Sequence, residues 1–451
     1  MKAPHTPREL ASASSGLVGK QNRPLPKFRI ALLVAFLVAI YVDVHLYVTS
    51  SFVIPSVFML LVLMPILGVM YHRRIYKYEA AFVGKILLVL LMSVLLSPGF
   101  EYIDQKLFGL VQAVAAIIGA VLLLKLLDDL PRHWVARVLL VLSVALVAGA
   151  FLEVIGVLRP ISDSFREVAF HETLFYEADE RDVTITGFPR PKFFTAEPSY
   201  LAIGFFAFIN SWLILTYSKK SLFVACSLTV LMFVLTGSPV IVISLIVSLV
   251  IAQFSESDFT SLAFIGVLAC VVGLGLASMQ PQVFTSFLER VGESYQYLGT
   301  SIPTSENLRL VFPYLTLVDV LRVSPFFGVG VTGKELIERY SSLPVDPSAA
   351  LGNNALAWFF IYLGLVGSLL FIKFTLDYWR RARVGRIALL VVLVLALSQT
   401  MGGPETLKFW GYVSLFAGVV KKSSGPGERT LKAAGNRRAS GYKQLGKDKR
   451  W

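Results

Sequence analysis

The side chains that could do chemistry gather in two polar intervals of an otherwise apolar chain, residues 159–198 and residues 279–354. The first interval ends on Glu197, where the next apolar run begins. A carboxylate there, close in sequence to Arg190 and Lys192, is suited to accept a proton from a hydroxyl group. The interval therefore predicts a general base with cationic neighbours.

An ordinary helix start is the other explanation of Glu197, because it precedes Pro198, Ser199 and Tyr200. Proline belongs in the first turn of a helix, and an acid favours the positive N-terminal end. Helix physics accounts for Pro198 better than for Glu197, so both interpretations of the carboxylate stay open. Ser199 and Tyr200 are candidate binding residues beside it.

His171 is a second candidate base in the same interval. Histidine titrates close to neutral pH and serves as a general base, although a solvent-exposed histidine is equally consistent with the sequence. It is the only histidine of the two intervals, which argues against a histidine-based zinc site. The acidic run 177–182 has no fixed ligand spacing, so a solvated loop explains it better than a divalent metal site.

Two arginines of the second interval, Arg309 and Arg322, belong to an expected apolar helix over residues 307–323, started or kinked by Pro313. The planar guanidinium donates two hydrogen bonds in register, which suits a diphosphate. An arginine that extends to the membrane interface is the alternative. The sequence favours this alternative more for Arg322 than for Arg309.

Residues 328–333 match the pattern G-x-G-x-x-G but follow Ser-Pro-Phe-Phe and no β-strand, so we expect a tight turn and no dinucleotide site. Asn353 and Asn354 stand directly before the next apolar run. Their side chains are expected to cap its helix or to bind sugar hydroxyls.

Composition places these intervals in a membrane protein. Of the 451 residues, 55% are hydrophobic and only 16% are charged, whereas about a quarter are charged in soluble domains. Apolar runs of about twenty residues recur along the chain, which predicts about twelve membrane crossings. The expected fold class is all-α, a polytopic helix bundle with two long loops.

The formal net charge of +13 comes from the two ends of the chain, residues 1–29 and 421–451. Basic residues flanking membrane spans mark the cytoplasmic side, so we expect cytoplasmic termini and no nucleic-acid partner. Both polar intervals then face the opposite side of the membrane. The expected segments are a basic tail (1–29), an N-terminal transmembrane bundle (30–158), the first loop (159–198), central transmembrane helices (199–278), the second loop (279–354), C-terminal transmembrane helices (355–420) and a second basic tail (421–451).

Several short motifs resemble those of the bacterial O-antigen polymerase and O-antigen ligase superfamily. They are Phe194-Thr195-Ala196-Glu197-Pro198-Ser199-Tyr200, Leu235-Thr236-Gly237-Ser238, Arg309, Pro325-Phe326-Phe327-Gly328-Val329-Gly330, and Asn353-Asn354 with Gly364 and Gly367. The resemblance covers residues 190–405. The first motif is similar to the Glu-Pro-Ser stretch of exopolysaccharide polymerases.

This resemblance implies a C-type glycosyltransferase bundle of the bacterial inner membrane, with a polyprenyl-diphosphate-linked oligosaccharide as donor. Arg309 is implied to bind the diphosphate. Ligases of the family carry a histidine at the position of Asn353, and often an arginine where this chain has Pro239. The missing histidine favours a polymerase, and the missing arginine makes Arg190 or Lys192 an alternative diphosphate ligand.

The sequence thus predicts a polysaccharide polymerase whose partners are lipid-linked oligosaccharide, membrane lipid and other polysaccharide assembly proteins. The predicted catalytic residues are Arg309, Glu197 and His171, and the predicted substrate-binding residues are Arg190, Lys192, Ser199, Tyr200, Arg322, Asn353 and Asn354. No metal or other cofactor is expected.

Three other functions stay open: a ligase that moves glycan to a lipid or protein, a transporter of lipid-linked sugars, and a scaffold for polysaccharide assembly. A transporter requires polar residues in the middle of the membrane. Asp43 and Glu153 are the few candidates, and both are expected near helix ends.

Overall fold

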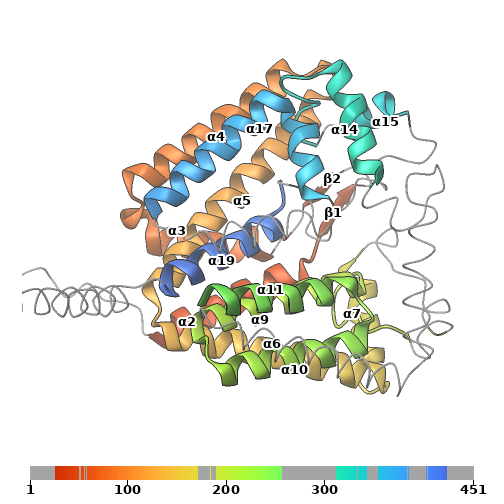
Figure 1. The fold of residues 1–451 in the computed structure, drawn as a ribbon. Helices are drawn as coiled ribbons and strands as arrows, with labels where there is room; N and C mark the ends of the chain where they lie inside the picture. Colours follow the sequence, from red (N-terminus) through yellow and green to blue (C-terminus); the bar gives the residue numbers. More distant parts are fainter. Residues whose placement is uncertain are drawn as a thin grey trace, which may run out of the picture.

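The computed structural model of the chain describes residues 26–49, 52–54, 56, 58–170, 183, 189–255, 311–332, 334–342, 354–382, 384, 403 and 405–423. This part of the protein is helical apart from one short hairpin (Figure 1).

The N-terminal half runs through α2 (Pro26–Val42), β1 (Leu46–Thr49), β2 (Phe52–Ile54), η2 (Met59–Leu63), α3 (Met64–Tyr71), η3 (His72–Arg74), α4 (Lys77–Leu96), η4 (Phe100–Tyr102), α5 (Ile103–Asp129), α6 (Arg132–Val154) and α7 (Arg159–Ala169). The two strands pair antiparallel, with Leu46 opposite Ile54. The rest runs through α9 (Pro198–Thr216), α10 (Lys219–Thr236), α11 (Pro239–Ser255), α14 (Phe312–Val323), α15 (Lys334–Tyr340), α17 (Ala355–Ala382) and α19 (Leu407–Ser423).

Helix-breaking residues set several of these boundaries. A Ser-Pro-Gly sequence over residues 97–99 separates α4 from α5. α9 begins on Pro198, and α11 begins on Pro239, where the missing backbone N–H and the fixed φ of proline are tolerated. The breaks turn one apolar sequence into a series of antiparallel neighbours.

Among the described residues, six helices are long and apolar enough to cross a membrane: α4, α5 with η4, α6, α9, α10 and α17. α11 contains a shorter apolar helix. The prediction of a polytopic helical membrane protein is supported at this level. Two of the runs counted in the prediction of about twelve crossings, residues 261–278 and 387–402, lie outside the described residues.

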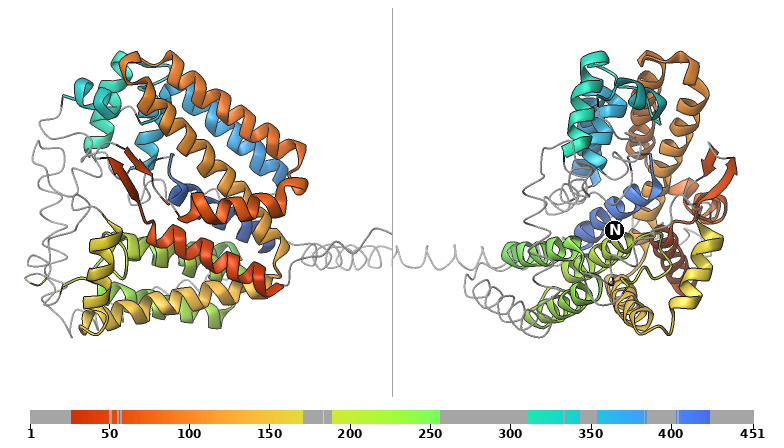
Figure 2. Two further views of the ribbon diagram at one scale, coloured as in Figure 1. Left: turned by 180° about the vertical axis from the view of Figure 1, so that it is seen from behind. Right: turned by 90° about the vertical axis from the view of Figure 1, so that its right-hand side faces the viewer.

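The helices form two groups with α2 and α19 between them (Figures 1 and 2). One group contains α4, α5, α14 and α17, and the other contains α6, α9, α10 and α11. α19 packs against both α5 and α9, and α2 also contacts both groups. The buried face of α19 therefore joins the two halves of the bundle.

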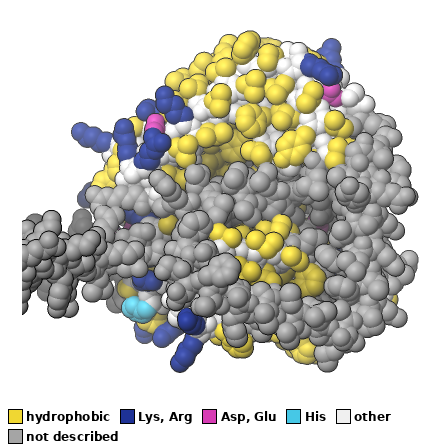
Figure 3. Space-filling model, viewed as in Figure 1, with side chains coloured by type: hydrophobic (Ala, Val, Ile, Leu, Met, Phe, Trp, Pro, Cys, Tyr) yellow, Lys and Arg dark blue, Asp and Glu magenta, His cyan; other side chains and the backbone are white. Residues whose placement is uncertain are grey.

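The outer surface over α4 and α17 is apolar. Leu88 and Leu369 are 57% and 62% exposed, and Figure 3 shows apolar side chains across the upper part of this face, with Lys and Arg mainly toward its left end. Aliphatic side chains directed outward along membrane-length helices suit contact with lipid chains.

Charged residues gather at one end of the bundle, here named the basic rim. Its ion pairs join Arg74 Nη1 to Asp129 Oδ2 at 2.7 Å, Lys125 Nζ to Glu79 Oε1 at 2.7 Å, and Lys421 Nζ to Asp128 Oδ2 at 2.5 Å. The start of α2 reaches the same place, because Arg29 pairs with Asp129 at 3.5 Å. The start of α2 and the end of α19 therefore lie at the same end of the bundle.

The turn predicted from the glycine-rich pattern holds a break in α17. Gly364 has φ 63°, and the segment 324–330 supplies the missing hydrogen-bond partners of the broken helix. Val329 N donates to Ile361 O at 2.9 Å, and Leu365 N donates to Pro325 O at 2.8 Å. No side chain fits at Gly328 or Gly364, because a Cβ on either would meet the other's backbone. The backbone N–H and C=O groups exposed by the break thus find hydrogen-bond partners within the protein.

α14 begins at Phe312, with Pro313 in its first turn. The predicted helix start at this proline is confirmed, whereas residues 307–310, including Arg309, lie outside the described residues.

Candidate functional site

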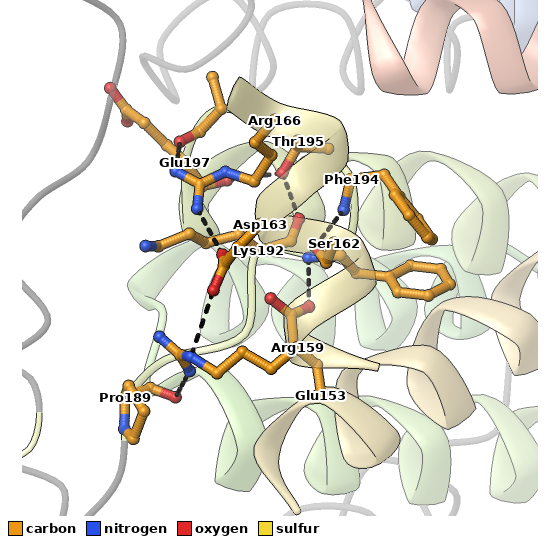
Figure 4. A network of polar contacts seen from close by, with 12 residues as sticks. Glu153, Arg159, Ser162, Asp163, Arg166, Pro189, Lys192, Phe194, Thr195 and Glu197 are labelled. Carbon is orange, nitrogen blue, oxygen red and sulfur yellow. Dashed lines mark hydrogen bonds and ion pairs between the residues drawn. The ribbon is translucent and has the colours of Figure 1, made fainter. Parts of the chain in front are cut away.

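The candidate site lies at the end of the bundle opposite the basic rim. There the segment 189–197 crosses the end of α6 and the buried face of α7 before it enters α9 (Figure 4). The predicted first loop is therefore partly helical, because α7 occupies its first eleven residues.

Glu153, in the last turn of α6, binds the backbone of the segment 189–197. It is fully buried, and Oε2 accepts a hydrogen bond from Phe193 N at 2.5 Å. The carboxylate also accepts a bond from the backbone N–H of Lys192. The Phe193 ring lies over Gly149, where a Cβ would collide with it. One acidic side chain thus fixes two successive backbone groups of the segment.

The face of α7 holds the segment from the side. Ser162 Oγ accepts from Phe194 N at 3.1 Å. Arg166, 3% exposed, pairs with Asp163 at 3.0 Å and donates from Nη2 to Ala196 O at 3.3 Å. An uncompensated arginine would be costly at this depth, so its bonds to Asp163 and to the backbone tie α7 to the residue just before Glu197.

Backbone strain concentrates at this place. Phe193 and Phe194 have φ of 38° and 64°, and Asp43 and Ser56, which lie beside each other, both have φ of 52°. Positive φ costs free energy for residues with a Cβ, and such conformations persist where surrounding contacts impose them. Tyr41 supplies one of these contacts, because its hydroxyl donates to Phe193 O at 2.6 Å.

Glu197 occupies the position before the first residue of α9, and the expected helix start at Pro198 is confirmed. Its side chain makes no capping bond to the helix backbone. Instead Oε2 accepts a hydrogen bond from Ser199 Oγ at 2.8 Å. The carboxylate is half-buried. The helix start therefore explains the backbone position of Glu197. It does not explain why an acidic side chain is present there, because the carboxylate does not cap the helix.

Lys408, near the start of α19, reaches the same place from a distant part of the sequence. It is 3% exposed. Its Nζ lies 3.4 Å from the ring centroid of Tyr200 and 3.9 Å from Asp43 Oδ2. The carboxylate of Glu197 adds a further electrostatic attraction. One buried ammonium thus contacts a tyrosine ring and pairs with the carboxylate of Asp43.

Asp43, just beyond the end of α2, has two further partners. His45 Nε2 lies 3.4 Å from Oδ2, and Ser56 Oγ donates to Oδ1. Burial by itself raises the pKa of Asp43, but His45, Lys408 and Ser56 outweigh it and hold the pKa at about 2. Asp43 stands between the serine and the histidine, so this set lacks the serine–histidine contact that activates a nucleophilic serine.

Tyr412, one turn beyond Lys408, faces this cluster with a buried hydroxyl. It has no hydrogen-bond partner among the described residues and lies near the Cα of Gly204 in α9. We name the group of Asp43, Glu197, Tyr200, Lys408 and Tyr412 the Lys408 cluster.

The structure brings some of the predicted site residues together. Glu197, Ser199, Tyr200 and Lys192 lie in or directly before the start of α9, and Lys192 is 2% exposed. Arg190 is half-buried in the same segment. His171 and the acidic run 177–182 lie outside the described residues.

The residues of the second loop have other surroundings. Asn354 is 1% exposed, and its Oδ1 accepts from Ala357 N at 3.0 Å, so the expected cap of this helix is confirmed. The side chain of Arg322 is 76% exposed and pairs with Asp319 at 3.5 Å. Its position fits the interfacial alternative better than a buried binding site. Asn353, like Arg309, lies outside the described residues.

Sequence reasoning missed Arg166 and Lys408. Ser162, Arg166 and Ala169 follow the i, i+4, i+7 spacing of one helix face, which signals that Arg166 faces inward. Lys408 stands alone at the start of an apolar run, and an isolated charge in a membrane helix points to a buried partner.

The arrangement brings a carboxylate, the group type that accepts protons in general base catalysis, into one unit with several cations. Glu197 supplies the carboxylate, and the cations of the crossing segment and α7 supply positive charge within the same unit (Figure 4). The described residues contain no group of three or more His, Cys, Asp or Glu placed to hold a metal ion. No known protein family and no curated protein sequence matches this chain.

Proposed function

We propose that this protein is a membrane glycosyltransferase that polymerises polyprenyl-diphosphate-linked oligosaccharide repeat units into a surface or exopolysaccharide. The observation that carries the proposal is the half-buried carboxylate of Glu197, which accepts a hydrogen bond from the side chain of Ser199 and makes no capping bond to the backbone of α9. A carboxylate held in this way at the end of a membrane bundle is suited to act as a general base.

In the proposed reaction, Glu197 accepts the proton of a hydroxyl on the terminal sugar of one lipid-linked unit. The hydroxyl oxygen forms a bond to the anomeric carbon of a second, growing chain. The bond from that carbon to its diphosphate oxygen breaks, and the diphosphate leaves with the electron pair. Arg309, together with Arg190 or Lys192, stabilises the negative charge of the leaving group. His171 is the alternative base.

The basic rim supports the orientation of the site. Basic residues at one end of membrane helices favour the cytoplasmic side, and Arg380 and Arg381 at the end of α17 add to this end. The proposal therefore puts both termini in the cytoplasm, the candidate site on the periplasmic side of the inner membrane, and about twelve crossings in a C-type bundle.

Transport of lipid-linked sugars receives less support from the buried polar groups. Asp43 and Glu153 lie at the ends of their helices. The polar side chains Asn210, Ser244 and Ser248, at the contact of α9 and α11, bond to one another at 2.8 Å. A closed set of this kind joins two helices and leaves few groups for a passing substrate.

The test is an assay with purified protein in lipid vesicles and lipid-linked repeat units as the only substrate. A ladder of longer products on a gel is expected for a polymerase. If a ladder forms only after an acceptor lipid or protein is added, and consists of the acceptor with glycan attached, the protein is a ligase. Absence of any transfer to either acceptor contradicts the proposal.

A further inference from the structure

The neighbouring helices α4 and α17 carry all their Lys and Arg side chains in the halves nearest the basic rim. These side chains, all exposed, are Lys77, Lys85, Lys373, Arg380 and Arg381. The halves farther from the rim, residues 86–96 and 355–372, contain no Asp, Glu, Lys or Arg. The outer face of the two helices is therefore positively charged toward one end and apolar along the rest, as Figure 3 shows.

The acids on these helices do not balance the cations. α4 contains one carboxylate, Glu79, which is buried and pairs with Lys125. α17 also contains one, Asp377, which pairs with Arg380 at 3.8 Å. Among the residues that the structure describes, no carboxylate forms an ion pair with Lys85 or Lys373.

Lys85 and Lys373 lie inside the helices and not at their ends. Each is at least eight residues from the rim end of its helix, which is about 12 Å along the helix axis. Charged side chains at such positions in membrane helices ordinarily face the interior of the bundle and have a partner there. Both lysines are exposed instead, so this ordinary explanation does not apply to them.

The Lys85 side chain extends toward α17. Its Nζ lies 5.2 Å from the centroid of the Phe374 ring, and Phe374 directly follows Lys373. A lysine that extends to the membrane interface directs its ammonium along its own helix, whereas Lys85 directs it across to the neighbouring one. Two ammonium groups brought close to each other repel, and an anion between them removes this repulsion.

We propose that this surface binds an anionic phospholipid. Its headgroup phosphate lies against Lys85 and Lys373, and its acyl chains lie along the exposed Leu88 and Leu369, one turn farther from the rim. Lys77 adds positive charge on the rim side of the phosphate.

Charge complementarity selects this class of lipid. A zwitterionic phospholipid has the same acyl chains, but its own ammonium group adds to the positive charge of the surface and weakens its binding. The lipid site does not depend on the reaction proposed above, because its ligand is a component of the membrane itself.

The decisive variant is Lys85→Gln/Lys373→Gln, which removes both charges and keeps long polar side chains. Its matched control is Lys219→Gln/Lys220→Gln, which removes two exposed lysines from the first turn of α10, in the other group of helices. Melting temperatures in detergent show whether each variant is folded. The substituted side chains are all exposed, so we expect wild-type values.

The measurement is native mass spectrometry of the purified protein, titrated with phosphatidylglycerol or with phosphatidylcholine of the same acyl chains. We expect wild type to bind the first phosphatidylglycerol about tenfold more tightly than the first phosphatidylcholine. Lys85→Gln/Lys373→Gln should bind the two lipids with affinities within about twofold of each other. The control should keep the wild-type preference.

Three results would overturn the proposal. Equal affinity of wild type for the two lipids shows that the lysines only extend to the membrane interface. A preference that persists in Lys85→Gln/Lys373→Gln places the anionic lipid elsewhere on the protein. A control that loses the preference to the same extent shows that the net charge of the protein, and not this surface, selects the lipid.

Discussion

At the scale of single residues, Glu197 combines an ordinary backbone role with an unusual side chain. It occupies the N-cap position before Pro198. Its carboxylate, however, accepts no hydrogen bond from the backbone N–H groups of α9 and accepts one from the hydroxyl of Ser199 instead. Lys192 is buried in the segment that leads to it, and the buried Arg166 of α7 donates a hydrogen bond to that segment. These observations support the proposal that Glu197 accepts the proton.

Glu197→Gln keeps the size of the side chain and its hydrogen bond to Ser199 but removes the proton acceptor. We expect the rate of polymerisation to fall about a hundredfold or more, with a melting temperature within about 2 °C of wild type. The measurement is a time course of polymer formation, with Glu338→Gln on the exposed face of α15 as control. A wild-type rate would move the role of base to His171.

Asp43 makes the free energy of unfolding depend on pH in the acidic range. Its pKa in the folded protein, about 2, lies below the ordinary value of 3.8. The contribution to stability is therefore complete above pH 4 and is lost as the pH falls toward 2, with a magnitude of about 2 kcal/mol. Denaturant unfolding in detergent should show this loss in wild type. If Asp43→Asn shows the same loss, another group causes it.

At the scale of elements, the break of α17 at Gly364 fixes the turn 324–330 and, through it, the end of α14. The turn donates and accepts the hydrogen bonds that the break would otherwise leave unmade. Because an unmade buried backbone bond is costly, the two elements should unfold together.

Gly364→Ala puts a Cβ against the backbone of Phe326, Phe327 and Gly328 at a positive φ. We expect it to lower the free energy of unfolding by about 3 kcal/mol. Gly84→Ala in α4 is the control, since its Cβ would meet nothing within 4 Å, and it should leave stability unchanged or raise it. Thermal melts of both variants in detergent measure the difference. Equal melting temperatures would contradict the coupling between the break of α17 and the turn 324–330.

Local sequence signals predicted several of these elements because each depends on nearby residues. The helix starts at Pro198 and near Pro313, the cap at Asn354 and the turn at residues 328–330 all follow from proline, asparagine or glycine in place. The helix α7 and the break at Gly364 were not predicted. Polar residues hid the amphipathic pattern of α7, and the break depends on hydrogen-bond partners about 32 to 40 residues away in sequence.

Only those residues of the candidate site that lie close together in sequence could be predicted. Glu197, Ser199 and Tyr200 belong to a single sequence motif, and Lys192 stands five residues before Glu197. Lys408 and Asp43 enter through the packing of α19 and α2 against α9, and no pattern in one sequence states which distant helices will touch.

At the scale of the whole molecule, the two ends of the bundle differ in charge. Arg74, Lys125, Arg380 and Lys421 mark the basic rim, and the Lys408 cluster lies at the other end. This asymmetry is the basis of the proposed orientation in the membrane.

Cysteine labelling tests the orientation. In a background without Cys226 and Cys270, Glu338→Cys in α15 should react with an impermeant maleimide when the outer membrane of intact cells is permeabilised. Arg381→Cys at the end of α17 should react only after the inner membrane is opened. The reverse pattern would place the candidate site in the cytoplasm and contradict a periplasmic polymerase.

The measurement that tests the central claim most directly is the polymerisation assay with Arg309→Ala, which removes the group proposed to bind the leaving diphosphate. Arg339→Ala, an exposed arginine of α15, is the matched control. We predict a product ladder with wild type and Arg339→Ala, and a loss of about a hundredfold or more in rate with folded Arg309→Ala. An undiminished ladder from Arg309→Ala would contradict the proposed role of Arg309, and the absence of a ladder from folded wild-type protein would contradict the polymerase itself.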